Sequence, residues 1–120
     1  MIRLYAPLTA VCLSLALTSP ALAQPASDRI LVMPFENVSR EGRIVWLGEA
    51  AAVLLADDLN ALGAPAITRD ERREAFERLK VPPAAALTDA TVIRIAQLLR
   101  ASQVIVGSLR TEGTDVVVQA

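Results

Sequence analysis

Apolar and polar positions along the chain form two kinds of pattern, typical of buried strands and of amphipathic helices. Residues 29–35 are almost continuously apolar, which predicts a strand covered on both faces, followed by a polar loop at 36–43. Residues 45–62 repeat with a helical period, and Gly63 follows where a C-cap is common. The buried side of this helix is predicted to carry six residues: Leu47, Ala51, Leu54, Leu55, Leu59 and Leu62.

The second half of the chain predicts two further helices and three strands. Residues 64–67 form a short candidate strand, and the T-x-x-E pattern of Thr68 and Glu71 is a capping box that opens a helix reaching about residue 79. Pro82-Pro83 breaks the chain, and Thr88 caps a helix over 89–101. Strands at 104–110 and 115–119 flank a turn at 111–114, which predicts a hairpin.

This order of elements predicts an α/β fold, a small mixed β-sheet with three helices packed on it, as one domain over residues 29–120. Its core is expected to bury four residues together: Val32, Leu55, Ile95 and Val106. Gly107 interrupts a Val/Ile-rich strand, which indicates close approach of the long helix or of a neighbouring strand. The hairpin strand is followed only by Ala120, so we expect either further sequence beyond it or an unpaired edge.

The first 23 residues have the layout of a secretory signal peptide. A weakly basic start is followed by an apolar run of about ten residues, which is too short for a membrane-spanning helix. Ala21-Leu22-Ala23 supplies small residues at the cleavage positions. We therefore expect cleavage before Gln24, a flexible lead-in over 24–28, and a periplasmic domain whose only membrane association is its export signal. The single cysteine, Cys12, would leave with the signal, so the domain would have no disulfide.

Composition excludes several classes of function. The chain has no histidine, which removes His-based triads and the commonest zinc ligand. Its formal charge is −1, and acidic neighbours cancel its arginines, which argues against nucleic-acid binding. No serine or carboxylate lies in a catalytic motif, so we expect no catalytic residue, metal site or cofactor.

Three places are candidate binding sites. Trp46 on the first turn of the long helix is either a core-edge residue or an aromatic anchor for a partner, and the strand residues Val116, Val117 and Val118 are candidate partner contacts. The loop residues Ser39, Arg40 and Arg43 precede a helix and are an alternative, anion-binding site, although the loop lacks a phosphate-binding motif.

Three segments together resemble the periplasmic TolB amino-terminal-like domains. They are ILVMPFEN at 30–37, WLGE at 46–49 and ASQVIVGSL at 101–109. The chain departs from that pattern in having Ala101-Ser102 where Gly-Ala is usual, and in stopping before a further helix or strand. Such domains precede tetratricopeptide repeats in exported bacterial proteins, and related folds occur in curli-secretion and flagellar outer-membrane lipoproteins and in activators of penicillin-binding proteins.

The resemblance implies a non-enzymatic assembly module and carries over no catalytic residues. The predicted function is an exported interaction domain at the N-terminal end of a larger protein. Its partner would be another protein or a downstream domain of the same chain, and homo-oligomerisation is left open. The alternative is a small-ligand binder, an anion binder or an enzyme that uses the 36–43 loop. A defined pocket at that loop would favour the alternative, whereas an exposed strand edge would favour docking.

Overall fold

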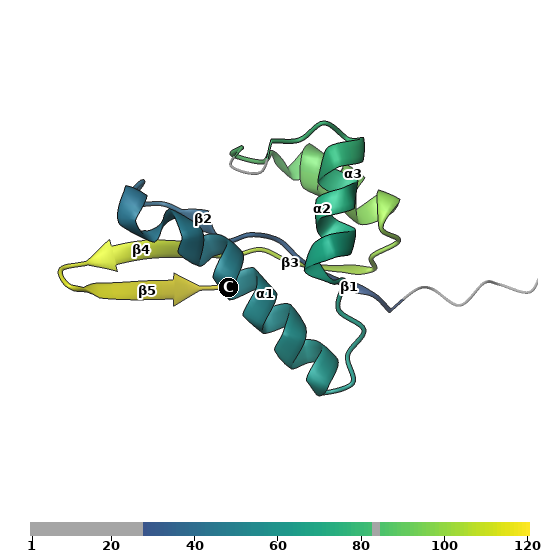
Figure 1. Ribbon diagram of the computed structural model, residues 1–120, viewed down its shortest axis with the longest axis horizontal. Coiled ribbons are helices and arrows are strands. Elements are labelled where there is room, and N and C mark those ends of the chain that lie inside the picture. The colour runs from purple at the N-terminus through teal and green to yellow at the C-terminus, as the bar shows by residue number, and fades with distance from the viewer. Residues whose placement is uncertain (1–27, 83–84) are drawn as a thin grey trace, which may run out of the picture.

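The computed structural model describes residues 28–82 and 85–120, so the predicted signal peptide, its cleavage site and most of the predicted lead-in lie outside the described residues. The described residues form a mixed α/β domain with three α-helices and two small sheets (Figure 1). The helices are α1 (Val45–Ala61), α2 (Arg69–Arg78) and α3 (Asp89–Leu98), and a 3-10 turn, η1 (Gly42–Ile44), leads into α1. The strands are β1 (Ile30–Val32), β2 (Glu36–Asn37), β3 (Gln103–Ile105), β4 (Ser108–Glu112) and β5 (Asp115–Gln119).

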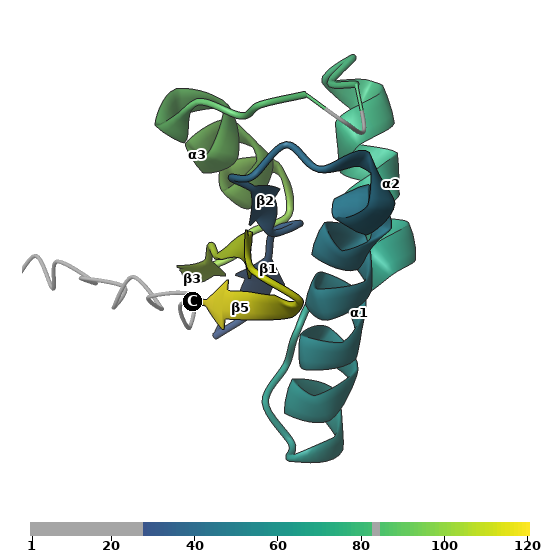
Figure 2. The ribbon, with the colours of Figure 1, turned by 90° about the vertical axis from the view of Figure 1, so that its left-hand side faces the viewer.

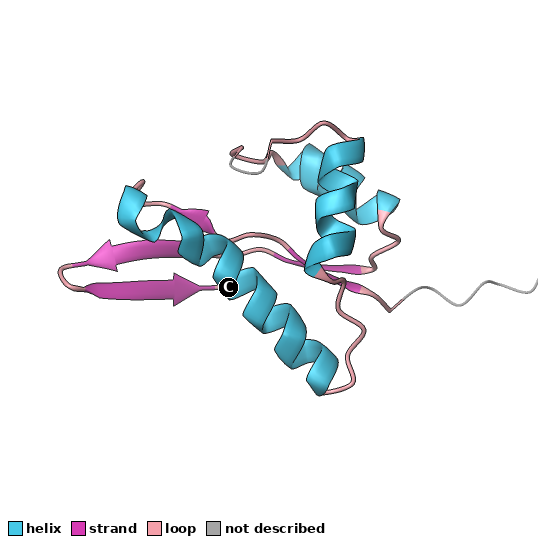
Figure 3. Ribbon diagram, in the orientation of Figure 1, coloured by secondary structure: helices cyan, strands magenta, loops and turns pink. Residues whose placement is uncertain are grey.

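The same two chain segments, 30–37 and 103–109, form the parallel strand pairs of both sheets, one pair after the other. β1 pairs in parallel with β3, β2 pairs in parallel with β4, and β4 pairs antiparallel with β5 (Figure 3). The run at 104–110 that was predicted as one strand is divided between β3 and β4, whereas the run at 29–35 contains only β1, and β2 lies in the segment predicted as a loop. Val32 pairs with Ile105 and Glu36 pairs with Ser108, so the three residues 33–35 lie opposite only two residues, 106 and 107. This is a bulge, and it accommodates Pro34, which has no backbone N–H to give to a ladder.

The core consists of two clusters on the two sides of β1, because successive residues of a strand point to opposite faces. Leu31 and Met33 pack with the buried residues of α2 and α3, including Phe76 and Ile95. The other cluster packs against α1 and contains Val32, Phe35, Ala52, Ala56 and Leu109. Figure 2 shows the strands lying between α1 and α3.

The expectation that four named residues are buried together was wrong. Val32 and Ile95 are both fully buried, but they belong to different clusters. Leu55 is half-buried beside Val32, and Val106 is 58% exposed. Val106 falls at the interruption between β3 and β4, where the side-chain alternation expected of one continuous strand does not hold.

Helix α1 matches its predicted bounds but buries a different face. Its buried residues are Gly48, Ala52 and Ala56, a stripe of small side chains, while the predicted Leu54 and Leu62 are exposed. Small residues allow the helix backbone to lie against the β1–β2 connection, and the Phe35 N–H donates to the Gly48 carbonyl at 3.0 Å. Leu47, Ala51, Leu55 and Leu59 flank this stripe as half-buried residues, as predicted.

Gly107 confirms the predicted close approach. A Cβ atom at this position would lie 2.7 Å from the Phe35 ring and 2.8 Å from the carbonyl oxygen of Gln119 on β5. The ring of Phe35 therefore occupies the space that a side chain at position 107 would need. Gly48 is restricted by the same residue, because its Cβ would lie 2.2 Å from the Phe35 carbonyl oxygen.

The helix ends follow local sequence signals. Thr68 and Glu71 form the predicted capping box, and the Thr88 side chain accepts from the backbone of Thr91. All three helices end in Schellman hydrogen bonds, with a positive φ at Gly63, Lys80 and Arg100. The predicted strand at 64–67 is reduced to a single bridge between Ala66 and Ile30.

Candidate docking surface

The outer strand β5 is positioned by a tight hairpin. Glu112 pairs with Asp115, so the loop contains only Gly113 and Thr114. Gly113 has a φ of +63°, and a positive φ at only the first loop residue is the pattern of a type II′ turn. Strand β4 therefore ends two residues later than predicted, at Glu112, and the turn holds β5 beside it over its full length.

The hydrogen bonds of β4 determine which backbone groups of β5 face outward. Leu109 accepts from Val38 at 2.9 Å, and the N–H of Thr111 donates to Ser39 Oγ at 2.9 Å, so both residues direct their backbone toward the β2 side. Because this direction alternates along a strand, Arg110 directs its backbone toward its partner Val117 on β5.

Val117 therefore directs its own N–H and carbonyl inward, whereas the neighbouring Val116 and Val118 direct theirs to the outer edge. A proline at Val117 would remove a β4–β5 hydrogen bond, and one at Val118 would remove an edge donor. No described strand pairs with this edge, and Figure 1 shows β5 on the outside of the sheet.

The side chains of the same two valines are also exposed. Val118 is opposite the buried Leu109 and Val116 is opposite Thr111, so both point to the face on which α1 packs. Their exposed fractions are 40% for Val116 and 57% for Val118, because α1 covers the inner strands. Val117 points to the opposite face and is half-buried. Apolar side chains and unpaired backbone groups thus occur together at the outer edge of β5.

Trp46 is exposed rather than part of the core. Its side chain is 63% accessible, and its indole N–H donates to the Arg43 carbonyl at 3.0 Å. One turn later, Glu49 pairs with Arg69 and Arg72 of α2. Trp46, three residues before Glu49, therefore shares the side of α1 from which Glu49 reaches α2.

Two residues of the predicted anion-binding loop make contacts with other residues of the chain. The loop contains β2 and η1 and is therefore more ordered than the sequence indicated. Ser39 accepts from Thr111, and the Arg43 guanidinium forms an ion pair with Glu41. Arg40, which has a φ of 53°, makes no ion pair with any described residue. Two of the three predicted anion ligands thus make a contact within the chain.

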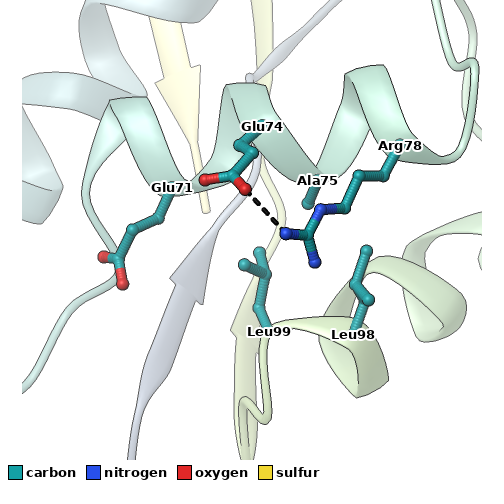
Figure 4. Close-up of a pocket in the computed structure, with 6 residues that line it drawn as sticks. All are labelled: Glu71, Glu74, Ala75, Arg78, Leu98 and Leu99. Carbon is teal, nitrogen blue, oxygen red and sulfur yellow. Dashed lines mark hydrogen bonds and ion pairs between the residues drawn. The ribbon is translucent and has the colours of Figure 1, made fainter.

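A shallow groove lies between α2 and α3 (Figure 4). Its volume is about 210 Å³, and it is lined by Glu71, Glu74, Ala75, Arg78, Leu98 and Leu99. Glu74 and Arg78, four residues apart on α2, form an ion pair at 2.8 Å and neutralise each other. The groove is smaller than the roughly 300–1,000 Å³ of typical ligand pockets.

Glu71 is held at the end of this groove by local donors. The Thr68 backbone N–H donates to its carboxylate at 3.0 Å, and Arg29 donates to it at 2.5 Å. The Thr68 hydrogen bond makes the largest contribution in lowering the pKa of Glu71, and the Arg29 hydrogen bond and charge act in the same direction. Arg29 also donates to the Leu99 carbonyl at the end of α3, so this cluster joins the two helices to β1.

Arg72 is a buried residue that the sequence analysis missed. Its side chain is 3% exposed, and it donates to the Val32 carbonyl at 2.8 Å and to the Glu49 carboxylate at 2.6 Å. Burial lowers the pKa of Arg72, while Glu49 opposes that change. The signal was present in its spacing, because Arg72 precedes the apolar anchors Ala75 and Phe76 by three and four residues.

The described residues contain no group of three or more His, Cys, Asp or Glu side chains that could hold a metal ion. Within residues 28–82 and 85–120, no helix has the length and apolar character needed to cross a membrane. No protein-family model, curated protein or solved structure matches the chain.

Proposed function

We propose that this chain provides an exported, non-enzymatic docking domain that uses the outer edge of β5 to bind another protein segment. The observation that carries the proposal is the coincidence at Val116 and Val118 of outward-facing backbone groups with exposed apolar side chains. An extended segment could add to such an edge as a further strand, with its main chain providing hydrogen bonds and the valines providing apolar contact.

The periplasmic location and the larger protein context belong to the same proposal. They are supported by the signal-like pattern of residues 1–23 and by the resemblance of three segments to TolB amino-terminal-like domains. In that context the added strand comes from a protein partner or from a later part of the same polypeptide.

Site-specific photocrosslinking in the native host tests this function. A photoreactive residue is placed at Val116 or Val118 of the natural protein, and at Val45 as a control, because Val45 is 61% exposed but lies on α1. We expect protein adducts from both β5 positions and far fewer from Val45. A folded, exported protein that gives no adduct at either β5 position, or equal adducts at all three, would contradict the proposal.

A further inference from the structure

We infer that the occupant of the β5 edge is a second copy of this chain, paired antiparallel about a two-fold axis at Val117; this inference rests on the proposed docking function. The sequence of β5, DVVVQ, is nearly symmetric about that residue. An axis at Val117 places Val116 opposite Val118 of the other copy, and the reverse. These are the two residues whose backbone groups face outward, so every unpaired group of the strand centre finds a partner.

Charge and the hairpin turn favour this arrangement over a parallel pairing and over an axis at Val116. With the axis at Val117, Asp115 lies opposite the neutral Gln119 of the other copy, whose amide N–H groups can donate to the carboxylate. A parallel pairing in register would instead place the two Asp115 carboxylates side by side, which is unfavourable. An antiparallel axis at Val116 would pair Val118 with Thr114, which lies in the hairpin turn and continues no strand.

The apolar side chains are matched as well. On the face that carries α1, Val116 and Val118 of each copy would form a cluster of four β-branched side chains across the axis. Because Val118 lies opposite the buried Leu109, this cluster would extend the apolar core of each copy across the interface. In a two-fold interface of this kind the outer β5 edge of each copy is covered by that of the other, so association stops at a dimer and does not extend into a fibre.

Cysteine crosslinking tests the register. With Cys12 replaced by serine, Val117→Cys places a cysteine opposite itself in a non-hydrogen-bonded pair, where Cα atoms are about 4.5 Å apart and a disulfide can form. Val116→Cys and Val118→Cys are matched controls, since each would face a valine of the other copy. We expect oxidation to give a crosslinked dimer from Val117→Cys and little from the controls.

Sedimentation equilibrium of the full chain tests the edge itself. Because one strand pair is a small interface, the dimer should be sought over concentrations from about 10 µM to about 1 mM. Val118→Pro removes one outward N–H per copy and keeps the β4 pairing, so it should raise the dimer dissociation constant at least about tenfold with little change in the denaturation midpoint. Val117→Pro, which removes an inward hydrogen bond, should lower the midpoint.

The outcomes separate this inference from the docking function. A chain that stays monomeric throughout and gives no Val117→Cys crosslink overturns the second copy as occupant. Photocrosslinks from Val116 and Val118 to a different protein would then still support docking. A dimer that survives Val118→Pro and does not crosslink at residue 117 uses another surface, and it likewise overturns the inference.

Discussion

Replacing Gly48 by alanine tests how α1 is seated on the sheet. In an ordinary helix interior this change stabilises by about 1 kcal/mol, because alanine has the higher helix propensity. Here the added Cβ would lie 2.2 Å from the Phe35 carbonyl oxygen and 3.3 Å from its carbon. Both are backbone atoms of the buried β1–β2 connection, so the helix must move away from it.

That movement has a cost that can be built from its parts. Overpacking a well-filled core costs about 1–3 kcal/mol. The 3.0 Å hydrogen bond from Phe35 to Gly48 would lengthen, and leaving a buried donor unsatisfied costs about 1–3 kcal/mol. Subtracting the gain of about 1 kcal/mol in helix propensity leaves a net destabilisation of about 1–5 kcal/mol, against the roughly 5–15 kcal/mol that holds a domain folded.

Urea denaturation followed by circular dichroism measures this change, with Gly42→Ala as the matched control. A Cβ at Gly42 meets nothing within 4 Å, and its backbone has no positive φ, so the control should be neutral or slightly stabilising. If Gly48→Ala stabilised the protein by about 1 kcal/mol, α1 would not lie against Phe35, and the small-residue stripe would have lost its explanation.

Four further predictions concern other parts of the chain. Arg72→Ala should destabilise by about 2–4 kcal/mol in the same urea assay, since it removes the buried partner of a carboxylate and a strand carbonyl. Lys80→Gly and Arg100→Gly should each raise the free energy of unfolding by about 0.5–1 kcal/mol, because glycine relieves a positive φ. The Thr68 backbone hydrogen bond lowers the pKa of Glu71 in the folded state, so its contribution to stability is present above the ordinary carboxyl pKa and is lost as the pH falls through the folded-state pKa; denaturation at several pH values should show that Glu71→Gln loses less stability over this acid range than the natural chain. Mass spectrometry of the exported protein should find Gln24 at the N-terminus, and an intact leader in the membrane fraction would contradict this.

The sequence predicted the elements of this fold better than their faces. Helix bounds agree within a few residues because apolar periodicity and capping signals such as Thr68 are local. The predicted buried face of α1 differs from the observed one because the prediction placed the large leucine side chains inside. The sheet instead selects Gly48, Ala52 and Ala56, which allow close backbone contact. That choice depends on the partner surface, which a helical wheel does not contain.

Only part of the candidate site could be predicted, because its backbone directions also depend on contacts between distant segments. Strong β preference located β5 and its valines, but it could not tell which of three consecutive valines directs its backbone outward. That distinction depends on the hydrogen bonds that Leu109 and Thr111 make on the far side of β4, with Val38 and Ser39. Those partners are about 70 residues away in sequence, and only the parallel pairing of β2 with β4 brings them together.

Three segments of the sequence, 30–37, 46–49 and 101–109, meet at Phe35. The first contributes its ring and backbone, the second contributes Gly48, and the third contributes Gly107, and each glycine is required by the space that Phe35 occupies. These motif residues are thus explained by packing of one helix and two strand pairs, and none of the three is a free surface group. Residues that pack the interior of a domain do not by themselves specify what the domain binds. The exposed valines and the outward-facing backbone groups instead occur together on β5, which lies outside all three segments.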